Sequence, residues 1–327
     1  MTCFHPLKAF KTGLKTDNGK DLLYITNRPG SFVPIEQAQK SLKVKIPFDS
    51  NFVTIWSPSP ELYNFIPVPC GQCVGCKLDH AREWAVRCTL EASQYRFNYF
   101  VTLTYDDLHL GKNKLSVRDP QLFFKRLRKR FPNVDIRYFG CGEYGSLTFR
   151  KHWHFIIFNL PLNDLIALPG KSKNGYLSYR SPLVESCWDH GFVEVDEFSF
   201  SAASYVARYC MKKVGDDSSV LLMSRRPGIG RIWLDEHIDE LKKDPCLYGS
   251  FGSSHRVPLP AYFKKVCSDP ERFGEEWLLG LQEVAKNNAE RSERLFINQH
   301  GLSDEELVGM YKDKLKKDQI RSLRRKL

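Results

Sequence analysis

The chain has 327 residues, of which 42% are hydrophobic, so it is long and apolar enough for a globular protein of one large domain or two. Its 49 Lys and Arg residues outnumber 38 Asp and Glu residues, and the net charge of +11 favours polyanionic partners such as nucleic acids. The sequence has no uninterrupted apolar run of about 18 residues and no basic-then-apolar signal sequence, which argues against a membrane span and predicts a protein kept inside a cell.

The first 69 residues predict an irregular or β-rich segment. Turn signals such as Asp17-Asn18-Gly19 separate short β-type runs such as Leu22–Thr26. We find no residues in this segment that point to a chemistry.

A cysteine cluster follows, in a chain whose ten cysteines are more typical of reduced thiols or metal ligands than of a disulfide framework. Cys70, Cys73 and Cys76 follow the pattern C-x2-C-x2-C, with glycines that allow tight turns, which favours ligation of a soft metal. Cys88 or His80 would supply the fourth ligand of a structural zinc site. An iron–sulfur cluster is an alternative, although the fourth Cys-Pro of a ferredoxin run is absent. A Cys-rich turn before a helix is another.

The next elements are a helix, a strand and a second helix. Residues 77–94 have a helical composition, with one apolar face formed by Leu78, Ala81, Trp84, Ala85, Cys88 and Ala92. Residues 99–105 form a β-branched and aromatic strand.

The second helix opens at Asp119-Pro120 and runs to Phe131. It is expected to bury Leu122, Phe123 and Leu127 and to expose five cations: Lys125, Arg126, Arg128, Lys129 and Arg130. Such a run is either a solvated face or a phosphate-contact surface.

Two histidines occupy alternate positions of the next strand, His152-Trp153-His154, so their side chains share one face. Glu143 precedes His152 by nine residues, across a possible hairpin turn, and would face the pair from the neighbouring strand. A Glu-His-His set with open coordination positions suits Mg²⁺ or Mn²⁺. A hydrogen-bonded histidine pair on an edge strand is the alternative.

A helix over residues 199–213 carries two tyrosines, with Ser199 or Ser201 available as its cap. Tyr205 and Tyr209 are four residues apart and therefore neighbours on one face. They either cover a core or form a reactive pair, since the cations of Lys212 and Lys213 would lower the cost of a phenolate or bind a phosphate. Beside a metal, such a phenolate would attack phosphorus, leaving a covalent phosphotyrosine and a free 3′-hydroxyl.

The rest of the chain is basic and less informative. The glycine-containing loop Ser224–Gly230 includes Arg225 and Arg226, which are expected to contact a nucleic-acid backbone. The chain has no P-loop motif. From residue 269 onward the pattern is helical, and Ser303–Glu306 forms a capping box before a basic last helix.

Together these motifs resemble those of the HUH endonuclease superfamily, and within it those of the replication initiation proteins of microviruses, single-stranded DNA phages of the gokushovirus type. The residues that carry the resemblance are Pro69–Cys76, Phe100–Asp106, Cys141–Gly145, His152–His154, Tyr205–Tyr209 with Lys212 and Lys213, and Ser224–Gly230.

The resemblance implies an α+β fold, a central antiparallel β-sheet with flanking helices, in which the histidine strand is in the middle and the tyrosine helix beside it. The HUH nicking core would be residues 99–230. It would be preceded by a β-rich segment (1–69) and a Cys-rich knuckle with its helix (70–98), and followed by a helical, basic C-terminal region (231–327). The cysteine cluster is not part of the general HUH core.

The resemblance also implies an activity. His152, His154 and Glu143 would bind the metal, Tyr205 and Tyr209 would be alternating nucleophiles, and Lys213 would assist at the phosphate. Such a protein nicks the replicative-form DNA of its phage at the origin, primes synthesis from the 3′-hydroxyl and recircularises the single-stranded genome. Strand opening and synthesis would fall to a host helicase and DNA polymerase in the host cytoplasm. The alternatives are a relaxase or transposase of a mobile element and a non-enzymatic zinc-containing DNA-binding protein.

Overall fold

The computed structural model describes residues 7–15, 21–26, 32–34, 52–54, 65–110, 115–145, 150–169, 177–212, 220–251 and 254–267, together with residues 274, 277 and 279. The chain divides into two compact units, Met1–Cys76 with Ile297–Leu327, and Lys77–Phe296, and each is described by itself. Among the described helices, none combines the length and the apolar character that a membrane span requires.

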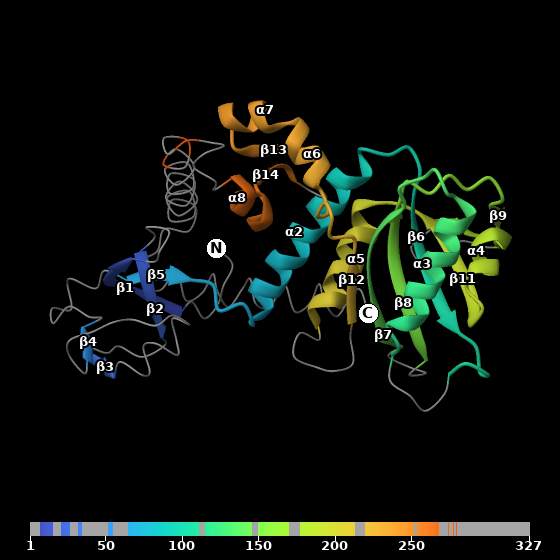
Figure 1. Cartoon of the computed structure of the whole chain (residues 1–327), viewed down its shortest axis with the longest axis horizontal. Coiled ribbons are helices and arrows are strands. Elements are labelled where there is room, and N and C mark those ends of the chain that lie inside the picture. The colour runs from blue at the N-terminus through green and yellow to red at the C-terminus, as the bar shows by residue number, and fades with distance from the viewer. Residues whose placement is uncertain are drawn as a thin grey trace, which may run out of the picture. The chain divides into compact units, whose positions relative to one another are not determined.

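The described part of the first unit is built mainly from antiparallel strands. β1 (Leu7–Lys15) pairs with β2 (Asp21–Thr26) on one side and with β5 (Phe65–Val68) on the other. β3 (Phe32–Pro34) and β4 (Phe52–Thr54) form a separate pair (blue in Figure 1). Five residues separate β5 from α2 (Val74–Ala92), so the cysteine cluster lies between a strand and the first turn of a helix.

The second unit contains a seven-stranded antiparallel sheet with the order β12-β7-β8-β6-β11-β10-β9. The strands are β6 (Asn98–Tyr105), β7 (Arg137–Tyr144), β8 (Lys151–Phe158), β9 (Ile166–Ala167), β10 (Ser178–Arg180), β11 (Gly191–Glu197) and β12 (Val220–Met223). The histidine strand β8 lies inside the sheet between β7 and β6, not at an edge. The expected α+β fold with a central antiparallel sheet is therefore confirmed.

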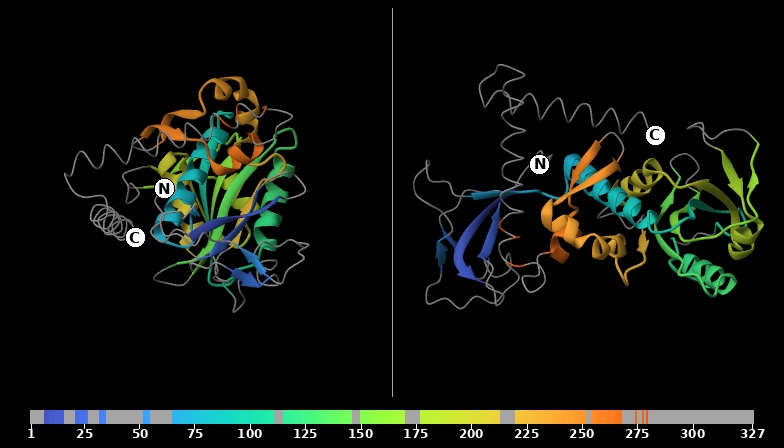
Figure 2. Two further views of the ribbon diagram at one scale, coloured as in Figure 1. Left: turned by 90° about the vertical axis from the view of Figure 1, so that its left-hand side faces the viewer. Right: turned by 90° about the horizontal axis from the view of Figure 1, so that it is seen from above.

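Alternate residues of β8 face two different helical layers. Trp153 and Phe155 pack in a core with α3 (Arg118–Arg130) and α4 (Pro182–Cys187). Ile156 and Phe158 pack in a second core with α2 and α5 (Phe200–Lys212). Figure 1 and Figure 2 show α3 and α5 on opposite sides of the sheet. Because strand side chains alternate, the two histidines of β8 lie on the α5 side.

Helix α2 lies on this second core through the residues that its sequence predicts. Ala81, Trp84, Ala85, Cys88 and Ala92 are buried, whereas Leu78 is only half-buried. The expected apolar face is therefore correct except at its first residue.

Helix α3 differs from its expectation at two points. It begins at Arg118, because Asp119 does not cap the helix: its carboxylate accepts a hydrogen bond of 2.7 Å from the Tyr105 hydroxyl. Proline is tolerated at residue 120 because the first-turn amides have no intrahelical partner. Phe124 is buried and stacks on Tyr138, whereas Leu122 is only half-buried.

The described C-terminal part of this unit is not entirely helical. It contains α6 (Arg231–Glu236), α7 (Ile238–Lys243), a hairpin of β13 (Cys246–Phe251) and β14 (Ser254–Pro258), and α8 (Ala261–Cys267). The hairpin contradicts the helical expectation for these residues: Leu247, Phe251 and Val257 bury apolar side chains against α8 and a second face of α2. The Ser303–Glu306 capping box and the basic last helix lie outside the described residues.

Candidate functional site: a Glu-His-His centre beside a tyrosine helix

The hairpin of β7 and β8 brings an acid and two histidines together. Glu143 is the register partner of His152, and its Oε1 lies 3.3 Å from His152 Nε2 and 3.1 Å from His154 Nε2. Glu143 thus faces the histidine pair from the neighbouring strand, as the nine-residue spacing predicts.

The separations of these atoms fit ligands around one small divalent ion. An octahedral ion with ligands at about 2.1 Å holds neighbouring ligand atoms about 3 Å apart. The two observed separations are close to this value, and the three ligand atoms lie within 4.8 Å of one another. Glu143 and His154 are buried and His152 is partly exposed, so such an ion would have one side open to solvent or substrate.

Burial sets the protonation state of the centre. Removal from water lowers the pKa of His154, and this outweighs the opposing effect of the Glu143 carboxylate. Burial alone would raise the pKa of Glu143, but hydrogen bonds to His152 and His154 lower it below its usual value. A neutral imidazole beside an ionised carboxylate is the form in which both groups bind a cation.

A threonine on β6 completes the surroundings of His154. Thr102 is the register partner of His154, and its Oγ1 lies 3.1 Å from His154 Nδ1. When Nδ1 donates its proton to Thr102, the Nε2 lone pair points to Glu143, which is the arrangement that a cation fills. We did not assign a role to Thr102 from the sequence. The signal was available, since Thr102 and Thr104 alternate along β6 as His152 and His154 do along β8.

Helix α5 places one of the two predicted tyrosines against this centre. Its cap is Ser199, whose Oγ accepts a 3.0 Å hydrogen bond from the amide of Ala202. The Tyr205 ring packs edge-on against the His154 ring, with centroids 5.6 Å apart. Tyr209 and Lys212 lie on α5, but their side chains are outside the described part of the chain, as is Lys213 altogether.

The basic helix α3 does not lie beside the centre, contrary to expectation. It packs on the Trp153 side of the sheet, whereas the two histidines lie on the α5 side. Two of its cations serve the fold: Arg126 forms an ion pair with Asp189, and Arg128 donates to the carbonyl of Ile136. A phosphate-contact role for α3, with Lys125, Lys129 and Arg130 exposed, stays a prediction.

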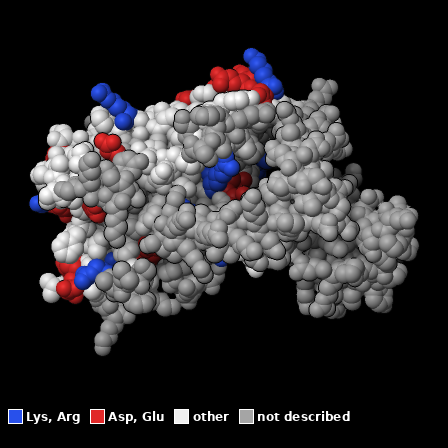
Figure 3. Space-filling view, turned by 180° about the vertical axis from the view of Figure 1, so that it is seen from behind, with Lys and Arg blue, Asp and Glu red and all other residues white. Residues whose placement is uncertain are grey.

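The loop Ser224–Gly230 lies on the same side as the centre but at the other end of β7. Its Arg225 and Arg226 are exposed, and its Ile229 packs in the core below α5. Six residues of β7 separate Arg137, which bonds to this loop, from Glu143, a span of about 20 Å. On the face shown in Figure 3, the described Lys and Arg residues are scattered among Asp and Glu.

The three cysteines of the C-x2-C-x2-C motif lie together, but Cys88 does not join them. The Sγ atoms of Cys70, Cys73 and Cys76 are within 4.8 Å of one another. Cys88 is twelve residues after Cys76 on α2, a rise of about 18 Å, and is buried in the apolar core. His80 is exposed, with its ring edge-on to that of Trp84.

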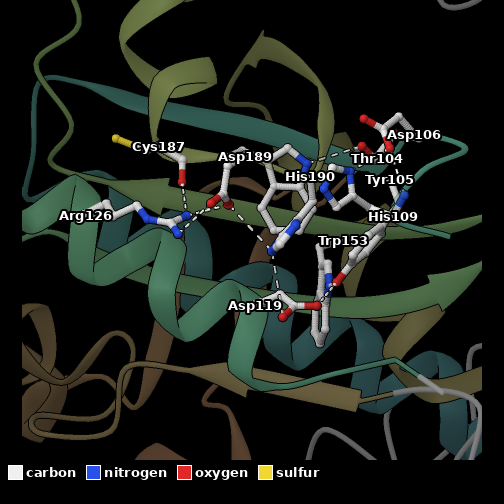
Figure 4. A network of polar contacts seen from close by, with 11 residues as sticks. Thr104, Tyr105, Asp106, His109, Asp119, Arg126, Trp153, Cys187, Asp189 and His190 are labelled. Carbon is white, nitrogen blue, oxygen red and sulfur yellow. Dashed lines mark hydrogen bonds and ion pairs between the residues drawn. The ribbon is translucent and has the colours of Figure 1, made fainter. Parts of the chain in front are cut away.

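A polar network supports β8 from behind, on the α3 side (Figure 4). The indole of Trp153, the residue between the two histidines, donates a 3.2 Å hydrogen bond to the Tyr105 hydroxyl. That hydroxyl in turn donates to Asp119, and His190 lies between Asp119 and Asp189 at 3.8 and 3.5 Å. Burial raises the pKa of Tyr105, so it stays a hydroxyl that can donate.

Comparisons with known proteins agree on one family. Residues 98–214 match the family model of the replication-associated protein ORF2. The chain is 37% identical to "Replication-associated protein ORF2" of Spiroplasma virus 4, over 64% of this chain and 68% of that protein. It is 32% identical to "Replication-associated protein VP4" of Bdellovibrio phage phiMH2K, over 67% and 72%. It is 31% identical to "Replication-associated protein ORF4" of Chlamydia phage 1, over 66% and 58%.

No solved structure matches the chain. The matched segment of the family model begins with β6 and ends just after α5, so it contains the Glu-His-His centre and the tyrosine helix. The chain belongs to the family of replication-associated proteins of microviruses.

Proposed function

We propose that this protein initiates rolling-circle DNA replication by nicking one strand at the phage origin and later rejoins the displaced strand. The observation that carries the proposal is the position of the Tyr205 ring against His154, within a centre of one acid and two histidines. A nucleophile beside a cation site on a rigid sheet is what phosphodiester transfer needs. The replication-associated role of the relatives supports the biological setting.

The proposed step is a transesterification at phosphorus. A tyrosine phenol loses its proton, its oxygen forms a bond to the scissile phosphorus, and the bond between phosphorus and the 3′-oxygen breaks. The 3′-oxygen takes up a proton, which leaves a 3′-hydroxyl and a 5′-phosphotyrosine. Because the phosphodiester is conserved in the covalent link, the reverse attack by a 3′-hydroxyl rejoins the strand without a nucleotide cofactor.

Three groups of this chain would hold the reacting phosphate. Glu143, His152 and His154 would bind Mg²⁺ or Mn²⁺, which supplies charge stabilisation at the phosphate oxygens when bound. Lys212 and Lys213 follow the second tyrosine in the sequence and would stabilise negative charge on the phenolate or phosphate.

The second tyrosine gives the proposal its replication cycle. Tyr205 and Tyr209 are one helical turn apart on α5, so both can be presented on one face. One would hold the displaced 5′ end while the other cuts the regenerated origin. The substrates would be the single-stranded and replicative forms of the phage DNA in the host cytoplasm, with a host helicase and polymerase supplying strand opening and synthesis.

The test is a covalent-adduct assay with the full-length protein. Labelled single-stranded oligonucleotides that tile the genome encoding this chain are incubated with Mn²⁺ or with a chelator. We expect one oligonucleotide to yield a denaturant-resistant protein–DNA adduct and a shorter product with a 3′-hydroxyl, in the presence of Mn²⁺. If no oligonucleotide is cut, the protein is not a nickase of this kind.

A matched set of Tyr→Phe variants tests the nucleophiles. The double variant Tyr205→Phe/Tyr209→Phe should form no adduct, whereas Tyr248→Phe, an exposed tyrosine on β13, should react as the parent does. An adduct that persists in the double variant would show that the nucleophile lies elsewhere.

A further inference from the structure

The cysteine cluster in the first unit has the geometry of ligands around a single ion. Cys70, Cys73 and Cys76 are thiols, not disulfides, and the Sγ atoms of Cys70 and Cys76 are 4.0 Å apart. A tetrahedral zinc ion with sulfur ligands at about 2.3 Å holds two of them about 3.8 Å apart. In an iron–sulfur cube each cysteine binds a different iron, which requires wider separations than those around one ion.

The backbone around the cluster favours the thiolate form that metal binding requires. The amide of Cys73 donates to Cys70 Sγ at 3.3 Å, and the amide of Cys76 donates to Cys73 Sγ at 3.5 Å. Hydrogen bonds to a charged form stabilise it, and such N–H···S bonds orient metal ligands. The turn that directs these amides depends on Gly71, whose φ of 74° lies in the left-handed region that favours glycine.

The place of Cys73 in the chain adds to this effect. It immediately precedes Val74, the first residue of α2, which is a 19-residue helix. A thiolate at this position interacts favourably with the positive end of the helix dipole. The amide geometry and the helix end are independent reasons for negative charge on these sulfurs.

We propose that Cys70, Cys73 and Cys76 bind one structural Zn²⁺ ion, separate from the divalent ion of the Glu-His-His centre. Zn²⁺ would replace the three thiol protons, which pass to the solvent, so that binding weakens as the pH falls. The site would fix the end of β5 to the first turn of α2, since Cys70 follows Val68 by two residues and Cys76 lies in the helix. This inference does not depend on the nicking chemistry.

The fourth coordination position is open to water or to another residue. Among the described residues, the group of potential ligands contains the three cysteines alone. Cys3 and His5 lie outside the described residues, and they precede β1, whose first residue Leu7 pairs with Val68. They are the Cys and His closest in sequence to the strand that borders the cluster.

The experiment measures metal content in a protein whose other metal site has been removed. Full-length His152→Ala/His154→Ala protein is purified without added chelator, and its zinc, iron and acid-labile sulfide are determined. We expect about one zinc per chain, no stoichiometric iron or sulfide, and, after exchange with Co²⁺, the intense thiolate-to-cobalt absorption of a tetrahedral sulfur site. Absence of zinc, or stoichiometric iron with sulfide, would overturn the proposal.

Two cysteine variants in this background distinguish ligands from other thiols. Cys73→Ser should lose zinc and cobalt absorption, whereas Cys88→Ala, on the same helix but in the apolar core, should retain both. Should Cys73→Ser fail to fold, a chelator titration of the parent replaces it: a melting temperature that falls with the chelator and returns with Zn²⁺ supports the site. Equal zinc loss from folded Cys73→Ser and Cys88→Ala, or a chelator-insensitive melting temperature, counts against it.

Discussion

The Thr102 hydroxyl lies 3.1 Å from Nδ1 of His154, across the pairing of β6 with β8. A group on the far nitrogen of a ligating imidazole fixes the tautomer and the ring orientation, and its loss costs about 10–100-fold in metal affinity. We therefore predict that Thr102→Val weakens Mn²⁺ binding by about this factor while Thr102→Ser retains most of it. Isothermal titration of the metal-free, full-length protein measures the effect.

Thr104→Val is the matched control, because Thr104 occupies the equivalent place opposite His152. No hydrogen bond from its side chain to that histidine is present among the described contacts, so we expect a smaller loss of affinity than for Thr102→Val. Equal losses in both variants would mean that the threonines act through strand packing and not through the His154 tautomer.

The burial of His154 has a direct consequence for its titration. Removal from water lowers its pKa below the usual 6.5, while the Glu143 carboxylate opposes this shift. A histidine with a lowered folded-state pKa contributes stability above 6.5, and this contribution is lost as the pH falls through the folded-state value. The metal-free protein should therefore lose thermal stability as the pH falls below 6.5.

Nuclear magnetic resonance of the imidazole C–H signals measures this pKa, with His154→Gln identifying the signal. We expect a midpoint below 6.5 in the parent and a still lower midpoint in Glu143→Gln, because the carboxylate that favours the charged imidazole is gone. A His154 midpoint at or above 6.5 would show that the carboxylate outweighs burial.

What could be predicted from sequence is what depends on neighbouring residues along one chain segment. Alternation on β8 and a short hairpin were sufficient to place Glu143 opposite His152. The i, i+4 spacing on α5 placed Tyr205 and Tyr209 on one helix. These relationships follow from fixed periods of strands and helices, and no tertiary contact is needed to deduce them.

What could not be predicted depends on which face of the sheet each helix covers. The α3 cations were expected beside the centre, but the chain order of a helix and a strand does not fix the face on which they meet. Phe124 is buried in place of Leu122 because it stacks on Tyr138, a contact with another strand. Cys88 has a ligand's chemistry, but helix length separates it from Cys76.

A buried ion pair holds the basic loop in place and is the basis of a stability prediction. Glu91 and Arg137 are almost fully buried and form an ion pair, and Glu91 also accepts a 2.6 Å hydrogen bond from the Gly230 amide. Removing one partner of a buried pair leaves the other uncompensated, at a cost of about 3–5 kcal/mol. Glu91→Gln should lower the free energy of unfolding by about this amount, measured by urea denaturation.

The control is Glu185→Gln, which removes an exposed ion pair with Arg180. We expect little change in stability there, because solvent screens such pairs. If Glu91→Gln is as mild as Glu185→Gln, the buried pair does not hold this loop.

The last prediction concerns Phe192, which exposes 66% of its surface and is in one cross-strand row with Thr104 and His152. Its neighbour Val193 packs in the α3 core, so Phe192 lies on the opposite face, the side of the metal centre. The row crosses two strand spacings, which places Phe192 about 10 Å from His152. An exposed aromatic ring at that range can stack on a base of a single strand whose phosphate is held at the centre.

Phe192→Ala should therefore weaken binding of single-stranded DNA by about 1–3 kcal/mol, while Phe192→Trp should retain it. Fluorescence anisotropy with Tyr205→Phe/Tyr209→Phe protein measures binding without cleavage. Because stacking releases no counterions, the dependence of affinity on salt should not change, whereas Arg225→Ala/Arg226→Ala should reduce it. Tyr248→Ala removes an equally exposed ring on β13 and is the control. If it weakens binding as much as Phe192→Ala, the effect is not specific to this row of the sheet.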